Sequence, residues 1–478
     1  MAYEKLELLI AGEFRQGSAG KTEPVINPAT EEVIGEVPHA SAADLDSALE
    51  ASAEGFKIWR ARTPIQRQAV MEKAARLMED RLEQSAQTLT VEMGKPLAEA
   101  KAELQFVIDV IRWYAEEGKR AYGRLVPARV PGVRQMVVKE PVGPCCAFVA
   151  WNFPGVNVIR KVAGAIAAGC SIVIKPSEET PGTAVAIARC FHEAGLPAGV
   201  LNVVFGVPDE VSRHLLASWT PRKVSFTGSV PVGKQLLKLS ADTVKRTTME
   251  LGGHAPVIVF DDADVNRVLT LMTGFKYRNA GQVCISPTRF YVQDKVYRSF
   301  VDGFAERAKA VKVGNGLDDG VQMGPLIAAR RLEVMERFVS DAKDHGAHVL
   351  AGGERVGNRG YFYAPTVLAD VPDTARIMVD EPFGPLAPIT HFDGFDEVVE
   401  RANSLPYGLA SYVFTSDGGK AARIADALEA GLVGVNNPFV STAETPFGGV
   451  NESGYGSEGG IEGLEAFLRT KFVIETRV

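Results

Sequence analysis

Hydrophobic and polar positions follow two rhythms in the first part of the chain. Between residues 41 and 115, apolar side chains such as Leu49 and Val70 recur every three or four positions, which predicts helices. Ser41 stands where it could cap the first helix. Residues 120–141 instead place valines among prolines and glycines, which favours a pair of strands.

A regular alternation of strands and helices begins at Cys145. Short apolar runs predict strands at 145–150, 171–175, 200–204 and 223–226. The intervening segments predict helices at 158–169 and 183–194, and one opening after Pro231. Such alternation implies right-handed crossovers and a parallel, doubly wound α/β sheet. Sheets of this kind bind ligands beyond the carboxyl ends of their strands.

A second alternating region predicts a second α/β domain. Its apolar runs lie at 257–260, 289–292 and 431–435, and helical stretches are expected at 297–311 and 329–346. The last residues, Lys471 to Val478, alternate and favour a strand. That strand could pair with 120–141 or with another subunit.

Composition narrows the class of protein. The chain has 478 residues, 46% of them apolar, and 52 Lys+Arg against 59 Asp+Glu give a net charge of 52 − 59 = −7. These values predict a globular protein of two or three domains and argue against a nucleic-acid partner. The sequence contains no apolar run long enough to cross a membrane and no secretory signal in residues 1–15, so we expect no membrane partner.

The cysteines are few and irregularly spaced. There are five, without C-x-x-C spacing, which argues against a disulfide framework or a zinc site. We therefore expect a reduced, cytoplasmic protein with no metal site, in which all but one of the cysteines lie in the core.

One G-x-G-x-x-G occurs at residues 454–459. It follows a turn-rich stretch rather than a buried strand, and no acidic residue stands about 20 residues later on a following strand. We interpret it as a plain flexible loop and not as a dinucleotide-binding motif.

Six other segments are more informative together. They are AWNFP (150–154), KPSE (175–178), FTGS (226–229), ELGG (250–253), GQVC (281–284) and EPFGP (381–385). The first four each lie just after a predicted strand. In order and spacing the set closely resembles the aldehyde dehydrogenase superfamily, over essentially the whole chain. The resemblance implies a Rossmann-type cofactor domain, an α/β catalytic domain and a small β bridging segment.

Three residues match the catalytic positions of that family. Cys284 would be the nucleophile, whose thiolate forms a thiohemiacetal and then a thioester. Asn152 would donate to the oxyanion, together with the Cys284 backbone N–H. Glu250 would be the general base that activates water to hydrolyse the thioester. One departure from the family lies near Asn152: Ala150 stands where most members have proline. The backbone here is therefore less constrained than in those members.

The resemblance also implies a dinucleotide site. Lys175 and Glu178 would bind the adenosine ribose, and a carboxylate at 178 would repel a 2′-phosphate, so NAD is favoured over NADP. Gly228 and Ser229 would present amides to the pyrophosphate at a helix start. The remaining cofactor positions are Trp151, Phe226, Leu251, Glu381 and Phe383.

The sub-group resemblance concerns the substrate. Arg160, Arg278 and Ser441 stand where succinate-semialdehyde dehydrogenases clamp the substrate carboxylate, and two guanidiniums suit that ligand. Other stretches resemble α-ketoglutarate-semialdehyde dehydrogenases more strongly. We therefore expect a short ω-oxo carboxylate of open chain length. Ser286 replaces a second cysteine found two residues after the nucleophile in some relatives, so we expect no local disulfide.

The expected organisation follows the same resemblance. Residues 1–119 and 142–252 would form the NAD-binding domain, 253–455 the catalytic domain, and 120–141 with 456–478 the bridging segment of a homodimer or homotetramer. Two alternatives are a coenzyme-A-acylating dehydrogenase, which would not need Glu250, and a structural protein without activity.

Overall fold

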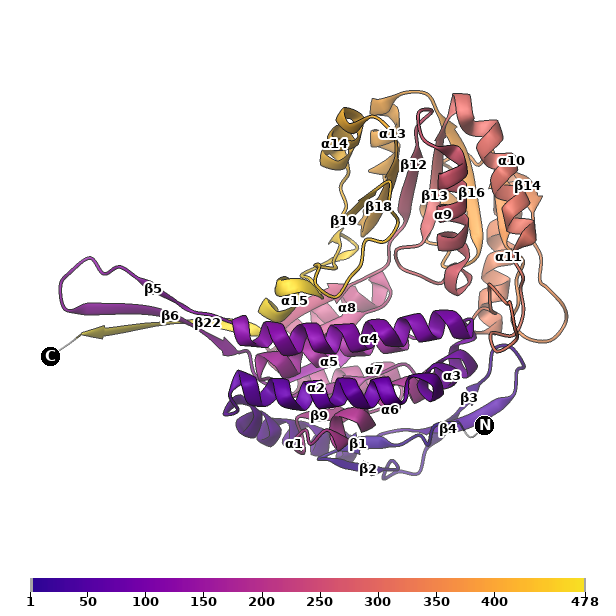
Figure 1. The fold of residues 1–478 in the computed structure, drawn as a ribbon. Coiled ribbons are helices and arrows are strands. Elements are labelled where there is room, and N and C mark those ends of the chain that lie inside the picture. Colours follow the sequence, from indigo (N-terminus) through magenta and orange to yellow (C-terminus); the bar gives the residue numbers. More distant parts are fainter. Residues whose placement is uncertain (1–2, 477–478) are drawn as a thin grey trace.

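Two largely parallel β-sheets, each flanked by helices, dominate the structure, a computed structural model that describes residues 3–476 (Figure 1). The five central strands of the first sheet are parallel, which confirms the predicted doubly wound α/β fold. From edge to edge this sheet contains β2 (Glu13–Arg15), β1 (Leu8–Ile10), β9 (Leu201–Val203), β8 (Ile172–Lys175), β7 (Cys145–Phe148), β10 (Lys223–Thr227), β11 (Arg246–Glu250) and β21 (Gly454–Tyr455).

Helices occupy the region where the apolar spacing predicts them. Ser41 and Asp44 form a capping box at the first helix, and Gly169 ends the fifth with a left-handed φ of 92°. The helices of this half are α1 (Ala42–Arg60), α2 (Pro64–Asp80), α3 (Leu82–Met93), α4 (Leu97–Glu117), α5 (Pro154–Ala168), α6 (Pro181–Glu193), α7 (Pro208–Ala217) and α8 (Val230–Ala241), with a 3-10 turn η1 (Gly118–Arg120).

The second sheet has seven strands and confirms the second α/β region. Its order is β14 (His348–Ala351), β15 (Thr366–Ala369), β16 (Leu386–Phe392), β13 (Pro287–Gln293), β12 (Ala255–Val259), β18 (Ala410–Phe414) and β19 (Leu432–Val435). The accompanying helices are α9 (Val265–Tyr277), η2 (Arg278–Gly281), α10 (Asp294–Ala310), α11 (Ala329–Asp344), α12 (Arg376–Val379), α13 (Phe395–Ala402) and α14 (Gly418–Ala427).

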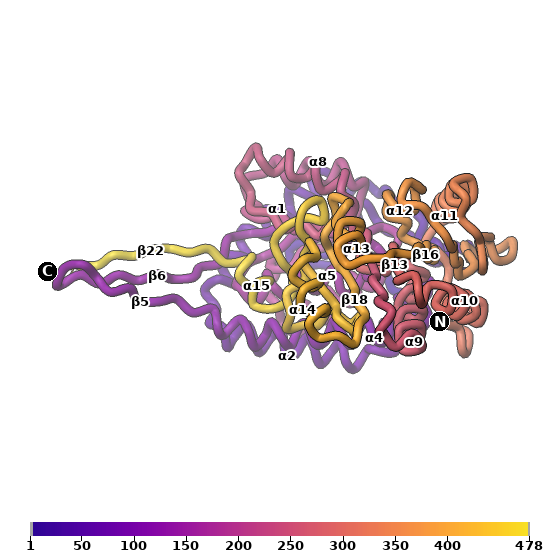
Figure 2. The backbone as a smooth tube through the Cα atoms, turned by 90° about the horizontal axis from the view of Figure 1, so that it is seen from above, coloured from indigo at the N-terminus to yellow at the C-terminus, as the bar shows by residue number. Residues whose placement is uncertain are grey.

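A three-stranded arm projects from the body of the protein (Figures 1 and 2). It consists of β5 (Arg124–Val126), β6 (Val133–Pro141) and β22 (Leu468–Thr476). The antiparallel register runs from Leu468 opposite Pro141 to Thr476 opposite Val133, so the C-terminal strand pairs within the chain with the 120–141 segment. Residues 477–478 of the predicted strand lie outside the described residues. The smaller elements are β3 (Thr22–Ile26), β4 (Val33–Pro38), β17 (Tyr407–Gly408), β20 (Val450–Asn451) and α15 (Gly460–Glu465).

The G-x-G-x-x-G segment is not a plain flexible loop, and that interpretation is wrong. Gly454 and Tyr455 form β21, which pairs antiparallel with β11 at Glu250 and Met249. A Cβ at Gly454 would stand 1.8 Å from the Met249 carbonyl oxygen, so only glycine permits this approach. The sequence pattern missed the strand because it is two residues long and follows a turn.

Buried side chains form two separate hydrophobic clusters, one for each sheet. The domain bounds that the resemblance implies stay a prediction. All five cysteines lie within residues 3–476 as free thiols; four are buried, and Cys284 is partly exposed. In the same residues, the helices are too short or too polar to span a bilayer.

Candidate active site

The carboxyl ends of the parallel strands open into a cavity of about 570 Å³. The segments that follow β7, β10 and β11 all contribute to its wall, as the positions of their motifs predict. The predicted site residues that line it are Trp151, Asn152, Arg160, Gly228, Ser229, Glu250, Leu251, Arg278, Cys284, Glu381, Phe383 and Ser441. Three predicted residues lie outside the lining: Lys175, Glu178 and Phe226.

Cys284 lies in a turn between η2 and β13, as its neighbours indicate. The backbone that precedes Cys284 has an unusual conformation, because Asn279 and Ala280 have left-handed φ values of 50° and 52°. Burial raises the pKa of the Cys284 thiol to about 12, with further contributions from the carboxylates of Glu381 and Glu250. The sulfur is therefore protonated at neutral pH in this structure, and a base or a nearby positive charge must favour the thiolate.

Glu250 ends β11 and is 3% exposed. Within the described residues, neither of its carboxylate oxygens has a hydrogen-bond partner. Burial raises the pKa of Glu250 well above its usual value, and the negative charge of Glu458 raises it further. Lys161 and Arg160 act in the opposite direction. A buried carboxyl group without partners can exchange a proton with water that enters the cavity.

Lys161 and Glu458 are functional neighbours that the sequence analysis missed. They form a buried ion pair, with 2.6 Å between Nζ and Oε1, and Lys161 Nζ also donates to Thr227 Oγ1 at 2.6 Å. Lys161 lies in the middle of α5, whose other residues are mostly small and apolar. A lysine in such a helix is a sequence signal that could have pointed to a buried charge.

Asn152 occupies the turn between β7 and α5 and is 4% exposed. Its Nδ2 donates to the Gln282 carbonyl oxygen at 3.2 Å, two residues before the nucleophile. Asn157 Nδ2 donates to Asn152 Oδ1 at 3.2 Å, which turns the donor end of the Asn152 amide toward the Cys284 loop. The structure therefore brings these two predicted residues together.

The proposed carboxylate clamp also converges on this cavity. Arg160 is 4% exposed, and its Nη2 donates to Ser441 Oγ at 2.7 Å. Its guanidinium lies 4.1 Å from the centre of the Phe447 ring, and that of Arg278 lies 4.6 Å from the Phe275 ring. The Nε atoms of both arginines are buried without a hydrogen-bond partner in the described residues. Buried, unsatisfied cationic donors favour an anionic ligand.

Of the groups predicted to hold a dinucleotide, Gly228 does not present a free amide as expected, because its backbone N–H donates to the Glu250 carbonyl oxygen at 3.0 Å. The other groups are consistent with the predicted role. Lys175 Nζ lies 2.5 Å from Glu178 Oε1, which also accepts from the Gly206 backbone N–H at 3.0 Å. Ser229 is the N-cap of α8, but its side chain makes no capping bond, so the first amides of the helix remain free for an anion. A Cβ at Gly228 would stand 2.3 Å from the Phe226 ring, so Phe226 packs closely against this loop.

Other residues predicted to contact the dinucleotide are aromatic or acidic. Trp151 and Phe383 pack edge to face, with 5.5 Å between ring centres. Glu381 accepts from the Gly253 backbone N–H at 3.2 Å, and burial raises the pKa of its carboxyl group to about 7. Arg331 Nη2 donates to the Pro382 carbonyl oxygen at 2.5 Å and so fixes the segment that carries Phe383.

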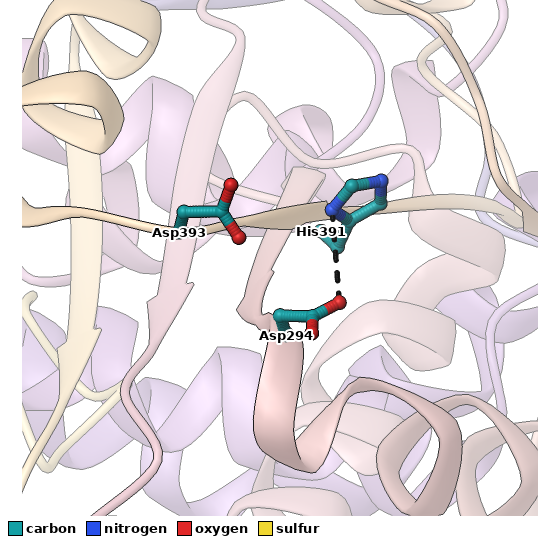
Figure 3. Close-up of side chains that lie close together, drawn as sticks. All are labelled: Asp294, His391 and Asp393. Atoms are coloured by element: carbon teal, nitrogen blue, oxygen red, sulfur yellow. Dashed lines mark ion pairs between the residues drawn. The ribbon is translucent and has the colours of Figure 1, made fainter.

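Within residues 3–476, one group of side chains could bring three metal ligands together (Figure 3). Asp294, His391 and Asp393 are all exposed, and 3.9 Å separates His391 Nδ1 from Asp294 Oδ1. Exposed acidic groups of this kind are common without an ion. This surface cluster therefore gives no reason to propose a bound metal.

The sequence matches the aldehyde dehydrogenase family over residues 14–473, and the chain belongs to this family. It is therefore an oxidoreductase of a family that uses NAD(P). The crystal structure of succinate-semialdehyde dehydrogenase from Burkholderia pseudomallei superposes with a TM-score of 0.98 at 41% identity, covering 99% of this chain and 98% of that one.

Several relatives are named for substrates that carry a negative charge. The 4-(hydroxymethyl)benzenesulfonate dehydrogenase of Comamonas testosteroni is 49% identical over 98% of both chains. The glutarate-semialdehyde dehydrogenase of Pseudomonas putida is 43% identical over 97% of this chain and 96% of its own. The NADP(+)-dependent succinate-semialdehyde dehydrogenase of Escherichia coli is 40% identical over 98% and 97%.

Proposed function

We propose that this enzyme oxidises a short ω-oxo carboxylate, such as succinate or glutarate semialdehyde, to the dicarboxylate with NAD as the oxidant. The observation that carries the proposal is the convergence of Arg160 and Arg278 on the cavity that contains Cys284. Two guanidiniums with unpartnered Nε atoms match a carboxylate at the far end of a short substrate. α-Ketoglutarate semialdehyde is an alternative within the same class.

Cys284 and Asn152 would perform the first half of the reaction. The Cys284 sulfur bonds to the aldehyde carbon, and its proton leaves to a base or to solvent. The negative charge that develops on the aldehyde oxygen is stabilised by Asn152 Nδ2 and the Cys284 backbone N–H. A nicotinamide held beside Trp151, Glu381 and Phe383 would accept a hydride from the former aldehyde carbon, and the acyl group would then remain on Cys284 as a thioester.

Glu250 would perform the second half. Its carboxylate takes a proton from water, the hydroxide attacks the thioester carbon, and the Cys284 sulfur leaves as the acid is released. The buried, unpartnered oxygens of Glu250 suit this role, because no other group in the described residues competes for the proton. The presence of Glu250 also favours water over coenzyme A as the acyl acceptor.

An aromatic anionic aldehyde is the second candidate substrate. Six phenylalanines line the cavity, and the Comamonas relative is named for a benzenesulfonate. Phe275 and Phe447 stand against the two guanidiniums, so an aryl ring that carries a sulfonate could pack among them. The phenylalanines that line the cavity are Phe106, Phe153, Phe275, Phe439 and Phe447, with Phe383 on the cofactor side.

NAD is proposed over NADP because Glu178 is buried beside Lys175, where a 2′-phosphate would meet a second negative charge. The Escherichia coli relative is named for NADP(+), so the preference needs its own measurement. We also propose that the enzyme is cytoplasmic and acts as a homodimer or homotetramer.

A substrate panel tests the proposal. The rate of NADH formation is measured with succinate, glutarate and α-ketoglutarate semialdehydes, 4-sulfobenzaldehyde and neutral aldehydes of matched length, with NAD and NADP. We expect the semialdehydes to give the highest kcat/KM. Arg160→Ala and Arg278→Ala should raise KM for anionic aldehydes about 10- to 150-fold and leave neutral ones nearly unchanged, because a charged hydrogen bond contributes about 1.5–3 kcal/mol.

Other outcomes of the panel would redirect the proposal. Equal losses on charged and neutral aldehydes would refute the clamp. A higher kcat/KM for 4-sulfobenzaldehyde would favour the aromatic candidate, and dependence on coenzyme A would favour the acylating enzyme. The control variant is Arg246→Ala, because this arginine lies on β11 and donates to the Leu468 carbonyl oxygen instead of lining the cavity.

A further inference from the structure

The Asn152 peptide is held by side chains from distant parts of the chain. Asn152 itself lies in a turn outside any helix or strand. Its carbonyl oxygen accepts from Lys95 Nζ at 3.0 Å and from Asn279 Nδ2 at 2.9 Å. The donors are 57 and 127 residues away in sequence. These two contacts therefore help to fix the backbone from which the Asn152 side chain projects.

Lys95 reaches this carbonyl from the turn between α3 and α4. Its side chain is fully buried, and Nζ lies 2.6 Å from Glu103 Oε2 on α4, whose side chain is 1% exposed. The ammonium also lies 3.9 Å from the centre of the Phe153 ring, next to Asn152. Apolar side chains of similar volume usually fill such a space at no loss of stability. The charges of the pair therefore call for a role other than packing.

Glu103 holds the other end of the same turn. Its Oε1 accepts from the backbone N–H groups of Gly155 at 2.9 Å and Val156 at 3.3 Å, in the first turn of α5. The approach is close, because a Cβ at 155 would stand 3.0 Å from Val107 and 3.2 Å from the carboxylate. One ion pair thus fixes the turn at Asn152 and at the start of α5.

We propose that the Lys95–Glu103 pair is a positioning device that holds the Asn152 amide where the oxyanion forms. Neither residue needs to touch the substrate for this role. The inference rests on the proposed role of Asn152, and it deepens that role by naming what fixes the donor. It is independent of which aldehyde is the natural substrate.

A double-mutant cycle tests the device. Lys95→Met is combined with Glu103→Gln, which removes both charges and leaves an oxygen for the amides of α5. Both changes are made together in the unaltered enzyme and in Asn152→Ala, and kcat is measured with a neutral aldehyde that the unaltered enzyme oxidises. We expect kcat to fall about tenfold, less than the roughly 100- to 1,000-fold loss on removing an oxyanion donor outright.

The decisive result is non-additivity. KM for the aldehyde and the affinity for NAD should change little, and the pair of changes should cause no further loss once Asn152→Ala is present. Equal losses in both backgrounds, or an unchanged kcat in folded protein, would overturn the inference. If the unaltered enzyme oxidises no aldehyde at all, that result refutes the proposed function and not the positioning role.

A matched control separates positioning from folding. Glu92 is also fully buried and accepts from backbone N–H groups at a helix start, those of Gly182 at 2.7 Å and Thr183 at 3.0 Å on α6. Glu92→Gln should lower the melting temperature without the tenfold loss of kcat. If the Lys95 and Glu103 changes give no folded protein, the cycle is run with Lys95→Gln, which keeps an N–H donor; a smaller loss of kcat is expected, and it should again disappear in the Asn152→Ala background.

Discussion

At the scale of single residues, burial raises the pKa of the two groups that we propose as nucleophile and base. Burial raises the pKa of Cys284 to about 12 and that of Glu250 well above its usual value. Both groups must lose a proton to act in the proposed reaction. The charges around them, above all Glu458 beside Glu250, therefore decide at which pH each half-reaction becomes fast.

Replacing Glu458 should shift the pH dependence of thioester hydrolysis. Glu458 raises the pKa of Glu250 through its negative charge, so Glu458→Gln should lower that pKa and move the rise in hydrolysis rate to lower pH. The rate is measured by rapid quench of the acylated enzyme across a pH series. Glu462→Gln, an exposed carboxylate on α15, is the control and should leave the profile unchanged. A shift to higher pH would contradict the assignment of Glu250 as base.

At the scale of elements, glycines decide where helices end and how closely loops approach the site. Gly169 ends α5 in the left-handed region, and the same helix begins beside Asn152 and carries Arg160 and Lys161. The helix α5 therefore connects the proposed oxyanion donor, the proposed clamp residue Arg160 and the buried ion pair of Lys161. Gly274 lies instead in the last turn of α9, exposed and with open space around it.

Two matched glycine substitutions should have opposite effects on stability. Gly169→Ala places a Cβ in a left-handed conformation and should destabilise the protein by about 1–2 kcal/mol. Gly274→Ala relieves the cost of a glycine within a helix and should stabilise it by up to about 1 kcal/mol. Thermal melting of both variants beside the unaltered protein provides the measurement. If both changes shift the midpoint in the same direction, the backbone explanation fails.

At the scale of the complete chain, the projecting arm is the feature whose role is least explained by the contacts within a single copy. Its two outer strands, β5 and β22, are edges with unpaired backbone groups (Figure 2). Leu125 on one edge is 65% exposed, and Phe472 and Ile474 on the other are 57% and 58% exposed. Exposed apolar side chains on unpaired edges favour an interface, and a second copy of this chain is the partner we propose.

Charging the arm should dissociate that assembly. We expect the unaltered protein to show a mass that is a multiple of 51.4 kDa in light scattering after size exclusion. Phe472→Asp with Ile474→Asp buries charge in the proposed interface and should give smaller species. Glu475→Ala, at a neighbouring position on the same strand, is the control. A monomeric unaltered protein, or a double variant of unchanged mass, would rule out this interface.

The fold class and twelve of the residues that line the cavity could be named from the sequence. Parallel strands start and end in the same direction, so motifs that follow β7, β10 and β11 meet at one edge of the sheet. That rule brings Asn152 and Glu250 together without any knowledge of tertiary contacts. Local glycines and caps, such as Ser41 and Gly169, likewise predicted helix ends from short-range physics alone.

Only the tertiary structure decided which distant charges meet in the interior. Lys161 pairs with Glu458 and Lys95 with Glu103, while Gly454 adds an edge strand beside Glu250. No periodicity in the sequence reveals such partners, because a repeat fixes which face of an element is buried but not which charge from another element is buried against it. The pKa values of the site follow from that burial, and so the state of its acid and its thiol could not be predicted from the sequence.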